Sequence, residues 1–239
     1  MENTKNYEIH RVAERVRHLK LLDSEFEMGE EFYPAHLSVA LIDAVFTPRS
    51  HYENHVLPVI RRYCEHFNIE RIRSGKNREL LPPTHKQETL KKLVSHYKTH
   101  GKKHMREEIF RARYRSPGTK IFKSDNVCRA AKELLKIKIN NLQDVSSTQP
   151  DEIKKSLCSI KGIGAATAHM FLMYCGRDDY VKGDVHVCAF VAEALGTEKV
   201  GPREAEQIVI GAAGEIDITP RALDYAIWKY GSNFSGADS

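Results

Sequence analysis

The chain has 239 residues, of which 41% are hydrophobic and 29% charged, and its formal net charge is +5. This composition is ordinary for a soluble globular protein, and the length suffices to bury a core without disulfides or metals. No run approaches the roughly 18 apolar residues of a membrane span, and the polar N-terminus predicts no signal peptide.

The pattern along the chain is helical almost throughout. Apolar residues recur at helical spacing in the segments 38–46, 54–67, 90–97 and 127–135, which predicts buried helix faces. We expect Thr84 to cap the third of these helices, with Gln87 as its capping-box partner, and Ser124 to cap the fourth. Pro202 and Pro220 read as helix starts. Because no segment alternates with period two, the predicted fold class is all-α.

The charge is unevenly distributed along the sequence. Residues 71–132 contain 18 Lys and Arg against 5 Asp and Glu, whereas acidic residues are in excess over the remainder. A basic central segment in an otherwise acidic chain is typical of a protein with a surface that binds a polyanion. A solvated, lysine-rich helix face is the alternative. The five scattered cysteines favour reduced thiols over a disulfide framework, so we expect an intracellular protein, in the cytoplasm, nucleoid or nucleus. We also expect the protein to be a monomer.

Residues 157–174 carry the most informative pattern. A short helix ends at Ile160, the stretch 161–164 (Lys-Gly-Ile-Gly) turns the chain, and a second helix begins near Ala165. The two glycines permit a tight turn and close approach of the backbone to another body. The free N–H groups at the start of the second helix can hold a phosphate without reading sequence. An ordinary turn between helices is the alternative, but the isoleucines beside the glycines favour the phosphate site.

This stretch resembles the helix-hairpin-helix of base-excision DNA glycosylases, the superfamily named for its hairpin, a Gly/Pro loop and an aspartate (HhH-GPD). Residues 180–187 stand where that family has its loop and catalytic aspartate, and Asp184 lies 20 residues beyond Gly164. The resemblance implies that Asp184 stabilises an oxocarbenium-like sugar and orients or deprotonates the attacking water. From local sequence, Asp184 is equally well explained as the N-cap of a helix over 185–194. Both roles can hold at once.

By the same resemblance, several residues are expected to contact DNA: Arg49, Lys123, Lys161, Gly162, Gly164, Ala166 and Thr167. Arg49 stands where many members have a glutamine that fills the gap left by the extruded base. This departure leaves the role of Arg49 open, although an arginine can hydrogen-bond to bases. Lys123 resembles the lysine of the helix that precedes the hairpin.

Asp43 is a second candidate catalytic acid. It is the single charge in an apolar helical run, and its region resembles the place where mismatch-adenine glycosylases hold a glutamate that protonates the base. The alternative is a boundary aspartate that pairs with an arginine or caps a neighbouring segment. A neutral damaged or mismatched base needs such an acid, whereas an alkylated base already carries positive charge, so the role of Asp43 bears on the substrate class.

Two missing sequence features indicate which branch of the superfamily the chain resembles. Members that also cut the backbone have a lysine two residues after the second hairpin glycine, where this chain has Ala166, so we expect no lyase activity; Lys161 and Lys182 remain as nearby alternatives. No cysteine follows Cys188, which excludes the family's C-terminal iron–sulfur loop. No organic cofactor is expected. The resemblance implies one monovalent cation, Na+ or K+, held by the backbone carbonyls of Cys158, Ile160 and Ile163.

The twelve histidines raise the question of a metal site. His96, His100 and His104 share a helical face, and a looser group comprises His51, His55, Cys64 and His66. Gly101 interrupts the first group and neither has the tight spacing of a zinc site, so we interpret these residues as part of an exposed basic face. The single tryptophan, Trp228, is expected in the core of the last helix rather than as a base-stacking platform.

Together these features predict a two-lobed HhH-GPD fold with a DNA-binding cleft. A six-helix lobe over 45–175 would end in the hairpin (about 157–174), and both chain ends, 1–44 with 176–239, would form the other lobe. The expected function is a monofunctional DNA glycosylase that acts on a flipped base in double-stranded DNA and leaves an abasic site. The alternatives are a non-catalytic helix-hairpin-helix DNA-binding protein and a helical scaffold for acidic proteins.

Overall fold

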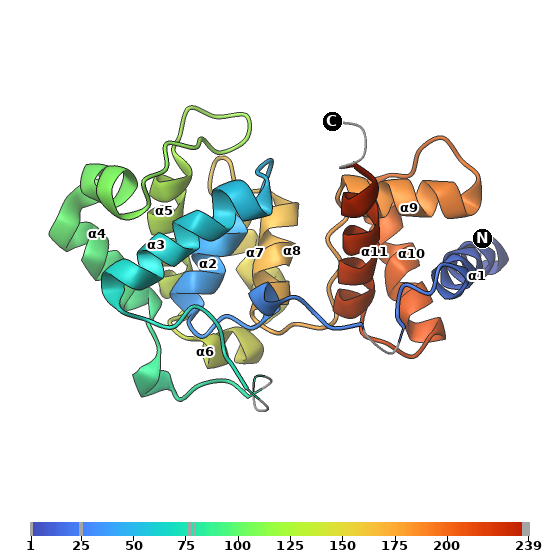
Figure 1. Cartoon of the computed structure of the whole chain (residues 1–239), viewed down its shortest axis with the longest axis horizontal. Coiled ribbons are helices and arrows are strands. Elements are labelled where there is room, and N and C mark those ends of the chain that lie inside the picture. Colours follow the sequence, from blue (N-terminus) through green and yellow to red (C-terminus); the bar gives the residue numbers. More distant parts are fainter. Residues whose placement is uncertain (1, 24–25, 76–77, 79, 236–239) are drawn as a thin grey trace. The chain divides into compact units, whose positions relative to one another are not determined.

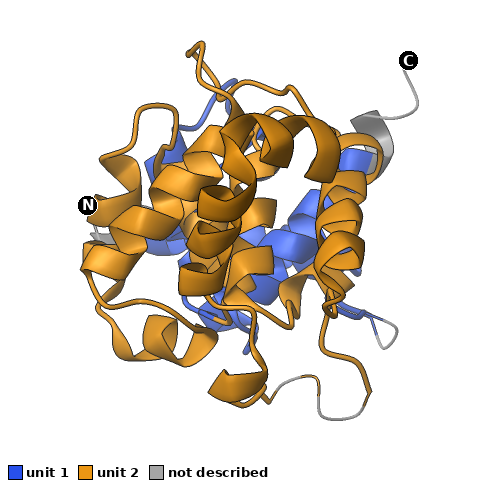
Figure 2. Ribbon diagram, turned by 90° about the vertical axis from the view of Figure 1, so that its left-hand side faces the viewer, with its two compact units in different colours: residues 1–29, 177–239 blue, residues 30–176 orange. Residues whose placement is uncertain are grey.

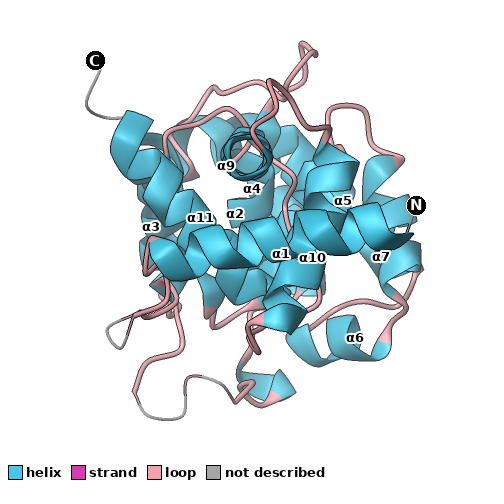
Figure 3. Cartoon of the chain, turned by 90° about the vertical axis from the view of Figure 1, so that its right-hand side faces the viewer, coloured by secondary structure: helices cyan, strands magenta, loops and turns pink. Residues whose placement is uncertain are grey.

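The computed structural model describes residues 2–23, 26–75, 78 and 80–235. Over these ranges the chain forms helices and loops without a β-strand, which confirms the predicted all-α class (Figure 3). In the same ranges, no helix combines the length and apolar character needed to cross a bilayer. The chain divides into two compact units, residues 30–176 and residues 1–29 with 177–239 (Figure 2).

The described residues of the larger unit form seven α-helices and four short helical turns. They are η1 Glu30–Phe32, α2 Leu37–Phe46, η2 Tyr52–Val56, α3 Leu57–Phe67, η3 Thr84–Lys86, α4 Leu90–His104, η4 Met105–Ile109, α5 Lys123–Lys136, α6 Leu142–Ser147, α7 Pro150–Cys158 and α8 Ala165–Tyr174 (Figure 1).

Helix α2 forms the centre of this unit. All ten of its residues are buried, and it packs against α3, α5 and α8. A helix that is apolar all round requires neighbours on every side, and this explains why the segment 30–44 belongs to the larger unit. The predicted lobe boundary at 44/45 therefore differs from the boundary of the structure at 29/30.

The smaller unit contains the two ends of the chain. Helix α1 (Glu2–His18) packs against α9 (Val185–Leu195) and α10 (Pro202–Glu215), and α11 (Pro220–Ser235) packs against the same two helices. Their core consists of small and branched apolar side chains, for example Val12, Val191 and Ile227. Pro202 and Pro220 begin their helices as predicted.

Two of the predicted caps are wrong. Thr84 begins only a single 3₁₀ turn, and α4 starts at Leu90 with Thr89 as its N-cap. Gln87 is completely buried, and its side-chain amide donates to Pro82 O and Gln143 Oε1. Helix α5 begins one residue before Ser124, which is itself buried. In both places tertiary contacts outweigh the local capping pattern.

Candidate functional site

The predicted hairpin is present as two packed helices, α7 and α8, joined by the turn 159–164. Gly164 stands at the N-cap of α8, where no side chain caps the helix. The first bond of this helix runs from Ala168 N to Gly164 O at 3.1 Å, so the N–H groups of residues 165–167 have no helical acceptor. Gly164, Ala165 and Ala166 are exposed, whereas the side chain of Thr167 is buried. At residue 167, therefore, the backbone N–H can contact a ligand but the threonine side chain cannot.

Gly162 fixes this turn onto the loop that precedes α5. Its φ is +92°, and a Cβ at this position would lie 2.7 Å from the Cβ of Ser116. Asn126, completely buried in the first turns of α5, donates from Nδ2 to Lys161 O (3.1 Å) and to Ser116 Oγ (2.8 Å). The hairpin turn and the loop are therefore packed as one surface. Glycine is required at residue 162 for both its conformation and its size.

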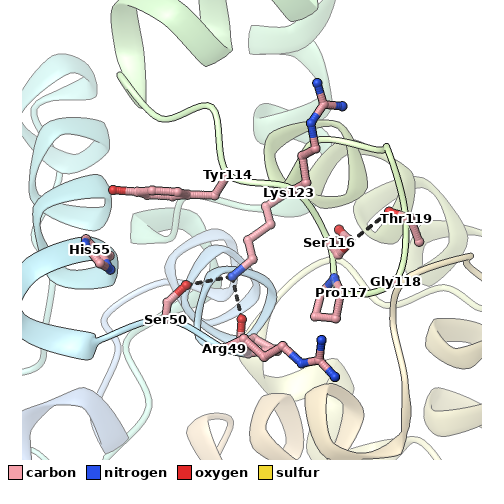
Figure 4. A pocket seen from close by; sticks show the side chains of 11 residues that line it. Arg49, Ser50, His55, Tyr114, Ser116, Pro117, Gly118, Thr119 and Lys123 are labelled. Atoms are coloured by element: carbon pink, nitrogen blue, oxygen red, sulfur yellow. Dashed lines mark hydrogen bonds between the residues drawn. The ribbon is translucent and has the colours of Figure 1, made fainter.

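Lys123 connects the same loop to the turn that follows α2. Its side chain is 2% exposed, and Nζ donates to Phe46 O (2.7 Å). Nζ also donates to Pro48 O (2.7 Å) and to Ser50 Oγ (2.8 Å), the two bonds drawn from Lys123 in Figure 4. Burial lowers the pKa of this amine to about 8. Because all three donors of the ammonium group are used within the protein, Lys123 positions the turn. The expectation that Lys123 contacts DNA is therefore not supported by its geometry.

These three segments form one edge of the larger unit, which we call the hairpin edge: residues 46–50, 111–122 and 159–164. None of the three contains an Asp or Glu. Their exposed cations are Arg49, Arg111, Arg113, Arg115, Lys120 and Lys161. Part of the predicted basic excess thus gathers at the hairpin turn. Exposed lysines also line α4, as the alternative interpretation expected: Lys91, Lys98, Lys102 and Lys103.

A pocket of about 420 Å³ opens in this edge between the first two segments (Figure 4). It is lined by Arg49, His55, Tyr114 and Arg115, with Lys123 also in the wall. The rings of His55 and Tyr114 lie 5.4 Å apart, and Tyr114 is 37% exposed. The backbone of Arg49 is left-handed, with φ +55°. The pocket therefore combines aromatic surface with guanidinium groups, which suits a nucleotide.

Asp43 lies in the interior of the larger unit, near the turn held by Lys123. It is 4% exposed and accepts hydrogen bonds from Thr47 Oγ1 (3.0 Å) and Tyr52 Oη (2.9 Å). Burial raises its pKa to about 7, and hydrogen bonds from Tyr52, Thr47 and Tyr174 oppose this shift. An acid with this pKa can donate a proton near neutral pH. The partners of its carboxylate are thus hydroxyl groups rather than the arginine of the alternative interpretation.

Asp184 belongs to the smaller unit, where it is the N-cap of α9 as predicted. Its Oδ1 accepts from His186 N (3.0 Å) and Val187 N (3.1 Å), and its Oδ2 lies 2.9 Å from Lys182 Nζ. The side chains of Lys182 and Asp184 are 13% and 18% exposed. The carboxylate is thus oriented by three donors and partly open to solvent.

The histidine groups do not form a metal site in the part of the chain that is described. His96 stacks on Phe67 with ring centroids 3.7 Å apart and bonds to Glu88 (2.7 Å), and the His100 and His104 rings stack at 5.3 Å. Gly101, with φ +77°, breaks the helical geometry of α4 between these residues. Trp228 is only half-buried and stacks on Tyr225 at 5.9 Å.

Sequence reasoning missed the residues that hold the candidate groups in place: Thr47, Tyr52, Ser116, Asn126, Tyr174, Glu206 and Asp224. Thr47 and Tyr52 lie only four and nine residues from Asp43, but others act on groups far away in the sequence. Asn126 bonds to Lys161 across 35 residues, and Asp224 bonds to Lys182 across 42. The sequence signal for this site was the run of polar residues that begins the amphipathic helix α5.

Among known proteins, neither the curated proteins nor the solved structures give a match to this chain. The family model that matches is described as a domain of unknown function, DUF8548, and it covers residues 10–232. This range includes the hairpin edge, Asp43 and Asp184. The chain therefore belongs to the DUF8548 family.

Proposed function

We propose that this protein is a DNA glycosylase that removes a damaged or mismatched base by hydrolysis and leaves an abasic site. The observation that carries the proposal is the hairpin edge, where the uncapped start of α8 is packed against an acid-free loop with exposed arginines. Backbone N–H groups and basic side chains together bind phosphates without reading sequence. Double-stranded DNA presents such phosphates at regular spacing.

The edge also suits a distorted duplex. A flipped nucleotide leaves unpaired bases, which aromatic and guanidinium groups can stack on and hydrogen-bond. The pocket between Arg49 and Arg115, with Tyr114 beside it, offers both kinds of group next to the phosphate-binding turn. We therefore assign Arg49 to the bases and the hairpin turn to the backbone.

Asp184 is the proposed catalytic carboxylate. Cleavage of an N-glycosidic bond develops positive charge on the sugar, and a fixed, ionised carboxylate stabilises that charge and can accept a proton from water. The N-cap bonds from residues 186 and 187 hold one oxygen of the carboxylate. They also fix its orientation, so little reorganisation is needed when the charge develops.

Asp43 is the proposed proton donor to the leaving base. Its pKa of about 7 means that a large fraction is protonated near neutral pH. Protonating a neutral base makes it a better leaving group, whereas a base that is already cationic needs no proton. The proposal therefore favours neutral damaged or mismatched bases as substrates.

A monovalent cation at the hairpin is part of the same proposal. Cys158, Ile160 and Ile163 would hold it through backbone carbonyls, which suit Na+ or K+ because they are neutral oxygen donors. Ile160 O already accepts from Ile163 N at 2.9 Å and keeps a second lone pair for coordination. The donor set fits the ion. When bound, the ion would supply positive charge toward a DNA phosphate.

The test is release of free base from duplexes that carry alkylated, deaminated, oxidised or mismatched bases, measured by chromatography. We expect release from at least one neutral lesion, reduced roughly a thousand-fold or more in Asp184→Asn because the charge is lost while the cap is kept. Tight duplex binding without release from any of these substrates would contradict the catalytic proposal.

A second candidate is a DNA-binding protein that catalyses nothing. The observation that favours it is the complete use of the Asp184 carboxylate, which accepts two cap bonds and contacts Lys182. Such a group is explained by stability alone. Duplex binding that depends on salt but is unchanged in Asp184→Asn, with no base released, would select this candidate.

A further inference from the structure

The loop that leads into α9 is attached through its backbone amides to two other helices of the smaller unit. Lys182 N donates to Asp224 Oδ1 of α11 (2.8 Å), and Gly183 N donates to Glu206 Oε1 of α10 (3.2 Å). The next amide, Asp184 N, bonds back to Lys182 O at 2.6 Å, which closes a three-residue turn. Three consecutive amides before α9 therefore each have a defined acceptor.

Close packing fixes the chain on both sides of Asp184. A Cβ on Gly183 would lie 2.6 Å from Pro202 O, so the loop lies directly against the start of α10. Beyond Asp184, a Cβ on Gly231 of α11 would lie 2.8 Å from His186 Nδ1. The residues before and after Asp184 are thus both in contact with helices of the same unit.

The carboxylate of Asp184 takes its place from this loop. Its Oδ1 accepts the two cap bonds, and its Oδ2 contacts Lys182 Nζ at 2.9 Å. A carboxylate that acts on a developing charge must be held in one geometry, and a misplacement of roughly 1 Å can cost about a hundred-fold in rate. The bonds of the loop to α10 and α11 therefore bear on the chemical step as well as on stability.

The acceptor on α11 lies in the interior. Asp224 is 3% exposed, and burial raises its pKa to about 7. Whether protonated or ionised, a carboxyl group keeps an oxygen that can accept from Lys182 N. The contact therefore needs an acceptor oxygen of this shape and not a charge, so an asparagine at residue 224 would supply it.

We infer that Asp224 and Glu206 are positioning residues, which hold the loop 182–183 so that the Asp184 carboxylate is presented in its working geometry. This inference rests on the proposed function, because it assigns the two side chains a part in base removal. Neither side chain has to touch the DNA, since each acts through a backbone amide. Their loss should therefore slow the chemical step and leave duplex binding unchanged.

The experiment measures base release by the full chain in single turnovers with enzyme in excess, which separates chemistry from binding. The substrates are the duplexes with neutral lesions, and duplex affinity is titrated in parallel. We expect Asp224→Ala to release base about a hundred-fold more slowly with unchanged affinity, and Glu206→Ala to act in the same direction. Asp224→Asn and Glu206→Gln keep an acceptor oxygen and should retain the wild-type rate.

Hydrogen exchange of the backbone amides provides a second measurement that needs no activity. The amides of residues 186 and 187 are protected by the Asp184 carboxylate, so they should exchange faster in Asp224→Ala and at the wild-type rate in Asp224→Asn. Asp144→Ala is the matched control, because Asp144 also accepts from two backbone amides, Asn140 N (2.8 Å) and Asn141 N (3.0 Å), but in the larger unit. It should change neither base release nor exchange at 186 and 187.

The outcomes separate the two proposals. Wild-type base release that is unaffected in Asp224→Ala and Glu206→Ala would overturn the positioning role and leave the glycosylase intact. A rate in Asp224→Asn as low as in Asp224→Ala, or an equal loss in Asp144→Ala, would also overturn it. If the wild type releases no base, the glycosylase proposal fails. Exchange at 186 and 187 then decides whether residue 224 holds the carboxylate: faster exchange in Asp224→Ala supports this, and unchanged exchange contradicts it.

Discussion

Gly162 lies against Ser116 so closely that a Cβ on the glycine would be 2.7 Å from the Cβ of the serine. This contact joins the hairpin turn to the loop before α5, and Asn126 bonds to both partners. The position of the hairpin turn therefore depends on a residue without a side chain. The energetic consequence can be measured.

We predict that Gly162→Ala lowers the free energy of unfolding by about 2 kcal/mol or more, because a positive φ is unfavourable for alanine and the new methyl group displaces Ser116. Gly164→Ala is the matched control for stability: its φ is −115°, and a Cβ there has no neighbour within 4 Å. Urea denaturation of both variants checks this. Equal stabilities would show that the packing of residue 162 is not tight in solution.

Lys161 should contribute to DNA affinity through charge alone. We expect Lys161→Ala to weaken duplex binding and to reduce the slope of log affinity against log salt concentration by about one. Lys136→Ala, at the far end of α5 and exposed, should leave the slope unchanged. Titrations at several salt concentrations measure both variants. An unchanged slope in Lys161→Ala would remove the hairpin turn from the DNA interface.

Local signals in the sequence were sufficient to predict most of the helices and the role of Asp184 as a helix cap. The apolar run of α2, the prolines of α10 and α11 and the hairpin glycines each act on neighbouring residues, so they can be recognised from a short window. The cap of α9 is of the same kind, since Asp184 bonds to residues two and three positions ahead. These are the features that a single sequence predicts well.

The environment of Lys123 could not be predicted in this way. A lysine at the start of an amphipathic helix is normally solvated, but here the turn after α2 supplies three acceptors to its amine, from residues 73 to 77 positions away. The environment of Asp43 likewise includes a hydrogen bond from Tyr174 in α8 as well as those from its neighbours. Such sites arise from the packing of distant segments, so periodicity and caps do not reveal them. The boundary between the two units at 29/30 was missed for the same reason, because it depends on the helices of the larger unit against which α2 packs.

Asp43 should make stability depend on pH. Its pKa is about 7 in the folded protein, against an ordinary 3.8, so between these values the folded state holds a proton that the unfolded state has lost. The unfolding free energy therefore falls as pH rises from about 4 to about 7, by an amount on the order of a few kcal/mol from this group. In Asp43→Asn this contribution should disappear, and the variant should gain stability relative to the wild type as pH increases.

Denaturation at pH 5 and pH 8 measures that difference. Asp224, whose pKa is also raised to about 7 by burial, is present in both proteins, so its contribution cancels in the comparison. A stability difference between variant and wild type that is the same at both pH values would contradict a raised pKa at Asp43. If Asp43 donates the proton to the base, release should also decline above about pH 7 in the wild type.

The two roles of Asp184 can be separated by the choice of substitution. Asparagine caps a helix about as well as aspartate, whereas alanine cannot accept the bonds from residues 186 and 187. We therefore expect Asp184→Ala to lower the unfolding free energy by about 1 kcal/mol more than Asp184→Asn, while both variants lose base release to a similar extent. Denaturation and the base-release assay on the same preparations test this. If the asparagine variant kept full activity, the carboxylate charge would be unnecessary, and Asp184 would be a helix cap alone.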